Sequence, residues 1–307
     1  RRHVAFCEAV YDGTAEVEGV VCRRVTEDDI RTQCRKCWAQ GEIPLLTDTD
    51  GKHIRELEPE AVIDAILAKK NLGTSRDMAP LTVGLGPGFT AGEDVDYVIE
   101  TMRGHNLGRI IKKGSALPNT GVPGLIAGIG KERVIHSPAA GNMKNICQIA
   151  DLVEKDQVIA MVGDTPVKAA ISGVIRGLIR DGYPVFAGMK IADIDPRAEQ
   201  KKNCFTISDK ARCIAGGVLE VLLSCGVLPG KEKAVKNEDR KSIHRRRRKD
   251  QSDPWTGRKI FRTGKTSDRD HNHTYGMGTG TSLCRGRGCF GIMPAYRTIR
   301  IRYRGTS

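Results

Sequence analysis

An internal repeat over residues 134–197 constrains the fold of this chain more than any other feature of its sequence. When the first copy is shifted by 32 positions without a gap, apolar residues fall on apolar residues and glycine falls on glycine. The matched pairs are Gly141 and Gly173, Met143 and Ile175, Ile146 and Leu178, Val153 and Val185, Ile159-Ala160 and Ile191-Ala192, and Val162 and Ile194. Neither copy can bury its own apolar face, so we expect the two to close on each other as a pseudo-symmetric β-sandwich.

The tip between the two copies bears on whether this unit carries a prosthetic group. The repeat pattern resembles biotinyl/lipoyl-type barrel-sandwich domains, in which the modified lysine sits at the tip of the hairpin between the halves. Here the tip is formed by residues 163–166, and Lys168 lies beyond it on the next strand. We therefore predict a docking or lid module that is not acylated.

A second feature is a strand that ends in a glycine turn. Leu81–Leu85 is a short apolar run, and Gly86-Pro87-Gly88 breaks it, because glycine frees the backbone while proline fixes one φ. Val95, Val98, Ile99 and Met102 then recur at helical spacing, with Thr90 as a candidate cap. Free backbone N–H groups at a helix N-terminus commonly bind anions, so Gly86 and Gly88 are candidate cofactor-binding residues.

Charged side chains gather around this turn. Arg103, Arg109 and Lys69 are candidates to neutralise a phosphate, and Glu100 or His105 are candidates to move protons. Asp64, at the end of a predicted strand over residues 62–65, is a candidate to face the same cleft or merely to cap a turn. The alternative for the whole stretch is a glycine turn followed by a solvated, charged helix end.

Several long strings resemble one bacterial family, the selenium-dependent molybdenum hydroxylase system proteins, which are associated with maturation of the molybdenum cofactor. The strings are GLGPGFTAG (84–92), VIETMRGHNLGR (98–109), GSALPNTGVPG (114–124), VIDAILAKKNLGT (62–74) and FTISDKARCIAGGVLEVLL (205–223). The resemblance covers residues 4–226. It implies a nucleotide or molybdopterin-type ligand, for which Asn119 and Thr120 are further candidates, and a molybdenum hydroxylase apoenzyme as partner.

The resemblance also implies a partial Rossmann-like domain over residues 1–130. Family members begin earlier with a glycine-rich strand–turn–helix, so we interpret this chain as N-terminally truncated. Strands are expected at 17–25 and 43–47, separated by a helix that opens at Glu27 and carries Cys34 and Cys37. The lone C-x-x-C suggests zinc or redox chemistry, but no second pair accompanies it, so surface thiols are the preferred interpretation and no metal site is predicted.

The last ordered element is expected to be an amphipathic helix over residues 205–223. Ser208 is its candidate cap, Ile214, Val218, Val221 and Leu222 form its apolar stripe, and Gly226 ends it. We expect this helix, within residues 201–230, to pack the β domain (131–200) against the α/β domain, and we assign it no chemistry.

Charge divides the chain at residue 231. Residues 231–307 hold 21 Lys/Arg against 7 Asp/Glu, a net +14, which leaves −1 of the chain's total of +13 for the first 230 residues. This tail is predicted to be disordered, and it is either non-native sequence or a basic arm that binds nucleic acid. Ten scattered cysteines, no signal peptide and no apolar run of about 18 residues indicate a cytoplasmic protein without membrane contact.

Three functions remain open from the sequence. The first is a maturation protein that acts on or holds a nucleotide or molybdopterin-like anion. The second is a non-catalytic factor that delivers cofactor or selenium to the apo-hydroxylase and docks through the β domain. The third is a nucleic-acid-binding protein that acts through its tail.

Overall fold

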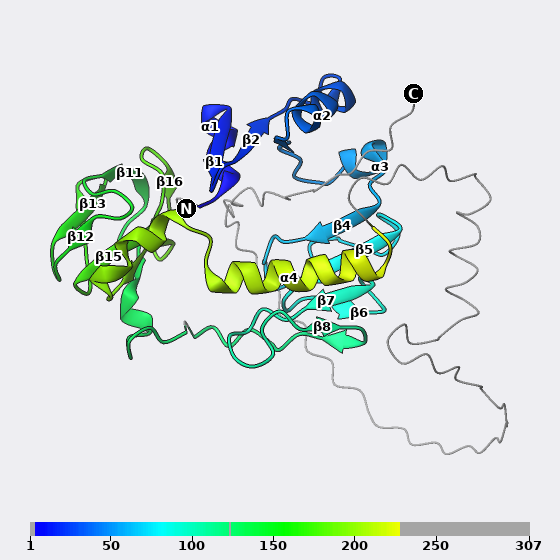
Figure 1. Cartoon of the computed structure of the whole chain (residues 1–307). Helices are drawn as coiled ribbons and strands as arrows, with labels where there is room; N and C mark the ends of the chain where they lie inside the picture. The colour runs from blue at the N-terminus through cyan, green and yellow to red at the C-terminus, as the bar shows by residue number, and fades with distance from the viewer. Residues whose placement is uncertain (1–3, 123, 228–307) are drawn as a thin grey trace, which may run out of the picture. The chain divides into compact units, whose positions relative to one another are not determined.

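The computed structural model describes residues 4–122 and 124–227, whose helices and strands are shown in Figure 1. Within these residues the chain is a mixed α/β protein with several small sheets and a C-terminal helix. No helix in this range is long and apolar enough to cross a membrane. The basic segment 231–307, and with it the predictions of disorder and of nucleic-acid binding, lies outside the described residues.

The N-terminal residues form a small sheet of order β1-β2-β3 with short helices beside it. The elements are η1 (Phe6–Glu8), α1 (Ala9–Asp12), β1 (Thr14–Val17), β2 (Val20–Arg24), α2 (Ile30–Ala39), β3 (Ile43–Leu45) and α3 (His53–Leu57). The segment 17–25, expected as one strand, instead contains a chain reversal, because Glu18 and Gly19 take φ values of 48° and 80° between β1 and β2.

Cys34 and Cys37 lie on the buried face of α2, not on its surface as expected. Both pack with Val25, Ile30 and Leu57 in a small core. Burial raises the pKa of the Cys34 thiol to about 11 and also raises the pKa of Cys37. A buried thiol with a raised pKa is a poor nucleophile, so these two cysteines serve packing.

A four-stranded sheet carries the motifs of residues 62–111. Its strands are β4 (Ala61–Asp64), β5 (Leu81–Leu85), β7 (Tyr97–Ile99) and β8 (Ile110–Ile111). Their order is β4-β5-β7-β8, in which β4, β5 and β7 are parallel and β8 is antiparallel to β7. Every residue of β5 is buried, as is usual for a central strand covered on both faces.

The helix expected over residues 90–102 does not form. The chain instead makes β6 (Thr90–Ala91), which pairs with β9 (Gly114–Ser115), and then enters β7. The apolar residues at helical spacing are fully buried and β-branched, a type that packs well on sheets: Val95, Val98 and Ile99. The Asp94 carboxylate accepts the backbone N–H of Thr90 at 2.8 Å and closes a loop. No helix N-terminus therefore follows the glycine turn, so the predicted helix is wrong and the N–H groups expected from it are not supplied there.

Residues 134–195 form two four-stranded antiparallel sheets. The strands are β10 (Val134–His136), β11 (Gly141–Asn145), β12 (Leu152–Val153), β13 (Val158–Val162), β14 (Thr165–Lys168), β15 (Gly173–Leu178), β16 (Pro184–Val185) and β17 (Lys190–Asp195). One sheet has the order β10-β17-β15-β12 and the other β14-β13-β11-β16. The 32-residue shift exchanges the two sheets strand for strand. Ile135 pairs with Ala192, and Val167 pairs with Ala160, the residues 32 positions away in each case.

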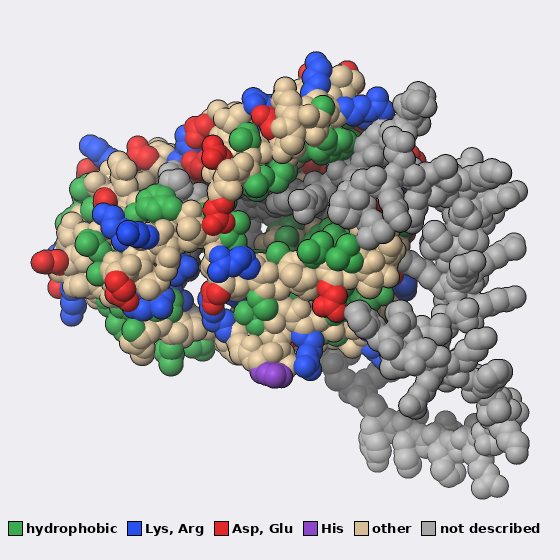
Figure 2. Space-filling view, in the orientation of Figure 1, with side chains coloured by type: hydrophobic (Ala, Val, Ile, Leu, Met, Phe, Trp, Pro, Cys, Tyr) green, Lys and Arg blue, Asp and Glu red, His purple; other side chains and the backbone are tan. Residues whose placement is uncertain are grey.

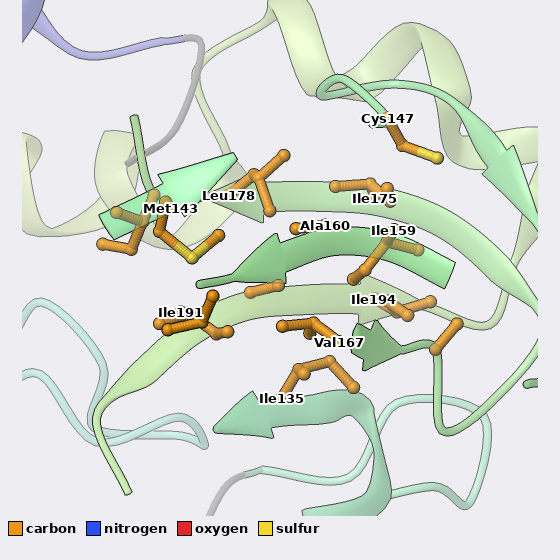
Figure 3. Packing of buried hydrophobic residues seen from close by; sticks show 14 of the residues in the cluster. Ile135, Met143, Cys147, Ile159, Ala160, Val167, Ile175, Leu178, Ile191 and Ile194 are labelled. Carbon is orange, nitrogen blue, oxygen red and sulfur yellow. The ribbon is translucent and has the colours of Figure 1, made fainter. Parts of the chain in front are cut away.

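The two copies are thus intertwined, and their apolar side chains share one core. Figure 3 shows this core between the sheets, with Ile135, Met143, Ile159, Val167, Ile175, Ile191 and Ile194 among its members. The symmetry breaks at Arg176, where β15 has a register shift that β11 lacks at the equivalent position. A β-bulge re-aims a side chain, so Arg176 has an orientation that its counterpart, Lys144, does not share.

Helix α4 (Asp209–Ser224) follows the 3-10 helix η3 (Ala198–Phe205) and lies along the parallel sheet in Figure 1. The predicted cap is confirmed, since the Ser208 hydroxyl oxygen accepts the N–H of Ala211 at 3.2 Å. Ile214 and Val221 of the predicted stripe are buried against the core of that sheet.

Two glycines let α4 approach the loop between β7 and β8. A Cβ on Gly108 would stand 2.7 Å from the carbonyl oxygen of Cys213, and one on Gly217 would collide with the carbonyl oxygen of Gly108. The Cys213 thiol donates to the carbonyl oxygen of Leu107 at 3.1 Å. Helix and loop are therefore in direct backbone contact, which fixes the start of α4 relative to residues 100–109.

Candidate functional site

Three loops leave the carboxyl ends of the parallel strands side by side. They are residues 65–74 after β4, 86–89 after β5 and 100–109 after β7. The strands are in register, and the N–H of Gly86 continues the pairing by donating to Ile99 O at 2.8 Å. Open α/β sheets bind ligands at this edge. Eight of the ten predicted site residues lie in these loops or directly next to them in sequence, so their surroundings decide what the site can do.

Asp64 shapes the first loop rather than facing a ligand. Its buried carboxylate accepts the N–H of Ile66 at 3.0 Å and the hydroxyl of Thr74 at 2.6 Å. The contacts of Asp64 are therefore those of a residue that caps a turn. Within this braced loop, Lys69 takes the left-handed conformation at φ 64° with an exposed side chain. A non-glycine residue in that conformation persists only where the surrounding structure holds it.

The glycine turn packs against its own chain. Gly86 has a φ of 80°, and a Cβ there would collide with the hydroxyl of Thr101. Gly88 has a φ of 110°, and a Cβ would lie 2.6 Å from the Cα of Lys70. Glycine is thus required at position 86 by the Thr101 side chain and at position 88 by the backbone of Lys70.

Glu100 is a buried structural carboxylate. One oxygen accepts the N–H groups of Thr101 and Met102, both at 2.7 Å, and the other accepts the N–H of Leu117 at 2.8 Å. Three backbone donors occupy three of the roughly four lone-pair sites of the carboxylate and hold it in place. The carboxylate ties the loop after β7 to the segment that begins at Leu117. The contacts oppose the predicted role in proton transfer.

Arg103 meets a residue 106 positions away. Its two terminal nitrogens donate to the two carboxylate oxygens of Asp209, at 2.8 and 3.1 Å. The pair lowers the pKa of the Asp209 carboxyl far below its usual range, first through Arg103 and then through the N–H of Lys210. It also raises the pKa of Arg103. The start of α4, to which the sequence assigned no chemistry, therefore belongs to the site.

Lys210 brings a further positive charge to the same place. Its pKa is lowered by burial and then by the charges of Lys69 and Arg103, against smaller opposing effects of Glu100 and Asp209. Within residues 4–122 and 124–227 the ammonium groups of Lys69 and Lys210 make no ion pair. Figure 2 shows basic and acidic side chains next to one another at the N-terminal end of α4.

Two arginines of the β domain complete the charge pattern. Arg176, from the bulge in β15, donates to Asp195 at 3.1 Å, and Arg197 donates to both oxygens of that carboxylate at 2.9 Å. Burial would raise the pKa of Asp195, but the hydrogen bonds from Arg197 and Arg176 outweigh it and lower the pKa. Arg176 also acts electrostatically on Asp209, and Arg197 on Arg103. We define the cationic cluster as Lys69, Arg103, Arg176, Arg197 and Lys210.

The cluster has more cations than anions. Its five positive side chains interact with four carboxylates, Glu100, Asp195, Glu199 and Asp209. The first turn of α4 adds little, because the Ser208 oxygens accept the N–H groups of Ala211 and Arg212. The surplus charge therefore rests on side chains, above all on Lys69 and Lys210.

The other predicted residues are not drawn into this cluster by any contact among the described residues. His105 and Arg109 are exposed in the loop after β7. Asn119 and Thr120 are exposed as well, and the Thr120 hydroxyl interacts locally with Val122. The described residues also contain no group of three His, Cys, Asp or Glu side chains placed to hold a metal ion.

Sequence reasoning thus found Lys69 and Arg103 but missed Arg176, Arg197, Asp209 and Lys210. The missed residues lie 70 or more positions further along the chain, and periodicity carries no information about such contacts. The string that contains Asp209 and Lys210 was nevertheless one of those that carry the family resemblance.

Comparison with known proteins gives one close relative. The chain is 50% identical over 220 residues to the uncharacterized protein YqeB of Escherichia coli (strain K12), over 72% of this chain and 40% of YqeB. The chain therefore spans well under half the length of that relative. No family model matches it.

Two solved structures show a weak likeness. One is the product-bound ectoine utilization protein EutE (DoeB) of Ruegeria pomeroyi, 18% identical over 27% of each chain with a TM-score of 0.19. The other is an aspartoacylase family protein of Mesorhizobium loti, 19% identical over 30% of this chain and 32% of that one, also with a TM-score of 0.19. TM-scores this low establish no common fold.

Proposed function

We propose that this chain binds a phosphate-bearing ligand, a nucleotide or a molybdopterin-type compound, at the cationic cluster. We further propose that it acts as an accessory protein in the maturation of selenium-dependent molybdenum hydroxylases, the family that its motifs resemble. One observation carries the binding proposal. Lys69 and Arg103, from two other segments, both act electrostatically on Lys210 and lower its pKa, at the ligand-binding edge of a parallel sheet.

Like charges held together cost free energy unless something offsets them. Among the described residues Asp209 offsets Arg103, and Asp195 offsets Arg176 and Arg197, whereas no carboxylate lies within ion-pair distance of Lys69 or Lys210. A phosphate group supplies up to two negative charges and several acceptor oxygens in one compact unit. It is therefore the ligand chemistry that best satisfies two lysines and an arginine.

The proposal favours binding over turnover. The three N–H groups at Glu100 leave that carboxylate committed to the backbone, and His105 makes no contact with the cluster among the described residues. A site that holds an anion without an available acid–base pair suits a protein that carries or presents a cofactor. The delivery role, with the apo-hydroxylase as partner, is therefore our preferred form of the proposal.

The finer description of the fold is part of the same proposal. The parallel strands β4, β5 and β7, with loops at their carboxyl ends, support a partial Rossmann-like domain. The exchange of two four-stranded sheets by a 32-residue shift supports a barrel-sandwich-type unit. In this unit Lys168 lies on β14 beyond the turn, which supports a docking role over an acylated carrier.

Calorimetric titration of the full chain with ADP, pyrophosphate and a molybdopterin-type compound tests the proposal. Charge-assisted hydrogen bonds contribute about 1.5–3 kcal/mol, so Lys210→Ala and Lys69→Ala should each weaken binding by roughly ten- to more than a hundredfold. The matched control is Lys168→Ala, an exposed lysine of β14, which should leave the affinity unchanged. Equal affinity of the parent and of Lys210→Ala would place the ligand elsewhere.

The same variants separate this proposal from nucleic-acid binding. An oligonucleotide held by a basic tail should bind equally well to Lys210→Ala and to the parent, and its affinity should fall steeply with salt. A compact phosphate ligand held at the cluster should lose affinity in the variant at constant salt.

A further inference from the structure

We infer that Asp209 occupies the place of the ligand's anionic group, so that a ligand must displace this carboxylate from Arg103, and that the site consequently selects anions with two negative charges. The inference rests on the proposed function and adds to it a mechanism of selection. It assigns to Asp209 the part of an internal competitor.

The geometry of the pair is that of ligand recognition. Arg103 donates two hydrogen bonds to Asp209 in a bidentate arrangement, the geometry in which arginine commonly binds carboxylates and phosphates. The two side chains are more than half exposed, at 57% for Arg103 and 69% for Asp209. Neither is locked in place by burial, so an anion from solution can reach the guanidinium and take over its two donors.

The charges around Asp209 favour such an exchange. Arg103, Arg176 and Lys210 all interact with this one carboxylate. Lys69 in turn acts electrostatically on Lys210, so a fourth positive charge lies nearby. A monoanion that replaced Asp209 would merely exchange one carboxylate charge for another. A dianion would keep the contact with Arg103 and bring a second charge toward the two lysines.

Asp209 competes well because it is tethered. A group held on the same chain acts at an effective concentration in the millimolar range or above, so a weak anion from solution cannot displace it. The pair also keeps the pKa of Asp209 far below neutrality, so protonation does not remove the competitor in any ordinary buffer. Displacement by a ligand of higher charge is then the route that opens the site.

The competing explanation is that Asp209 only stabilises α4. An acidic residue in the first turn interacts favourably with the helix dipole, and its loss would weaken the helix. Ser208 already caps α4, and the exposed pair contributes little to stability, so Asp209→Asn should stay folded. The helix explanation predicts that this variant is less stable and binds anions no better than the parent.

Inorganic phosphate and sulfate make a matched pair of probes. Phosphate passes from dianion to monoanion as the pH falls from 8 to 5, because its second pKa is about 6 to 7, whereas sulfate stays a dianion. Arginine side chains, and lysine side chains of ordinary pKa, stay protonated over this range. If a group of the protein changes its protonation between pH 8 and pH 5, the sulfate affinity changes as well. Sulfate is therefore the control for protonation of the protein.

The experiment is calorimetric titration of both anions into the full-length parent, Asp209→Asn and the control Glu220→Gln, which removes an exposed charge further along α4. The parent should bind sulfate with the same affinity at pH 5 and pH 8, but it should give measurable phosphate binding only at pH 8. Asp209→Asn should bind both dianions roughly two- to tenfold more tightly and should also bind phosphate at pH 5. Glu220→Gln should match the parent.

The outcomes distinguish the two proposals. If neither the parent nor Asp209→Asn binds either anion, the cluster is not an anion site and the proposed function fails together with this inference. If the parent binds and Asp209→Asn binds equally or more weakly, the competitor role is refuted while the site stands. If the parent binds phosphate as well at pH 5 as at pH 8, the selection of dianions is refuted.

Discussion

Replacement of Glu100 by glutamine tests most directly whether this residue is structural or catalytic. The carboxylate accepts three backbone N–H groups at 2.7 to 2.8 Å while almost fully buried. A glutamine carbonyl can still accept from Thr101 and Met102, which share one oxygen, but its NH2 group would then face the N–H of Leu117. The variant loses one charge-assisted bond and weakens two, and it leaves one part-buried donor without a partner.

Each of these changes has a known scale. A hydrogen bond to a charged group contributes about 1.5–3 kcal/mol, and an unsatisfied buried donor costs about 1–3 kcal/mol. Because the effects share one side chain and do not add fully, we expect Glu100→Gln to lower the free energy of unfolding by about 2–4 kcal/mol. That is a large part of the 5–15 kcal/mol typical of a folded domain.

Urea unfolding followed by circular dichroism measures this loss, with Glu93→Gln as the control. Glu93 is exposed in the loop before β7, so its variant should unfold at the same urea concentration as the parent. A change of less than about 0.5 kcal/mol in Glu100→Gln, the usual range for surface substitutions, would refute the structural role and revive Glu100 as an acid–base candidate.

Three further predictions concern stability. Gly88→Ala should destabilise the fold by about 2–4 kcal/mol, since its Cβ meets backbone, whereas Gly92→Ala, also at positive φ but with open space around it, should cost only about 1 kcal/mol in the same urea assay. Gly173→Ala should cost about 1–3 kcal/mol more than Gly141→Ala, its equivalent in the first copy, because only the former would drive a Cβ into a carbonyl oxygen; differential scanning calorimetry measures the difference. Lys210→Met should raise the free energy of unfolding by a few tenths of a kcal/mol at low salt, and the gain should disappear in 1 M NaCl; a loss of stability would show that the lysine supports the fold.

The β domain was the part of the fold most open to prediction from sequence. A gapless shift pairs most of the buried apolar positions of one copy with apolar positions of the other, and a chain that repeats a short strand pattern has few ways to bury it. The shift could not reveal the bulge at Arg176, because a register change alters pairing without altering periodicity.

The stretch after the glycine turn was open to two interpretations of the same residues. Val95, Val98, Ile99 and Met102 fit a helix by spacing, but their β-branched members favour a strand by shape. Tertiary context favoured the strand. The edge of β5 was available for pairing with β7, and a fully buried β5 needs a hydrogen-bonded neighbour on that edge. The periodicity of apolar residues alone carries no information about which strand edges are available for pairing.

The site was predictable only in part for a related reason. Lys69 and Arg103 stand out next to a glycine turn, and they do belong to the cluster. Their partners come from the start of α4 and from the β domain, and contact between α4 and the loop after β7 depends on the absence of side chains at Gly108 and Gly217. The sequence shows glycines at these positions, but it does not indicate which distant segment of the chain packs against them.

Asp195, which pairs with two arginines of the cluster, and Lys210 of the cluster affect stability with opposite sign, and this contrast bears on function. Asp195 has a lowered pKa in the folded chain, so its contribution to stability is present near neutral pH and is lost as the pH falls through its folded pKa. Lys210 has a pKa below its ordinary 10.5, so the folded chain holds that proton less firmly than the unfolded chain does, and stability rises with pH through the interval between the two values. Near neutral pH the charge of Asp195 therefore supports the fold, whereas that of Lys210 opposes it. Natural sequences tolerate such a cost most readily where function uses the unfavourable group. A dianion bound between Lys69 and Lys210 would reverse the cost, which is why ligand binding at this place should also stabilise the folded chain.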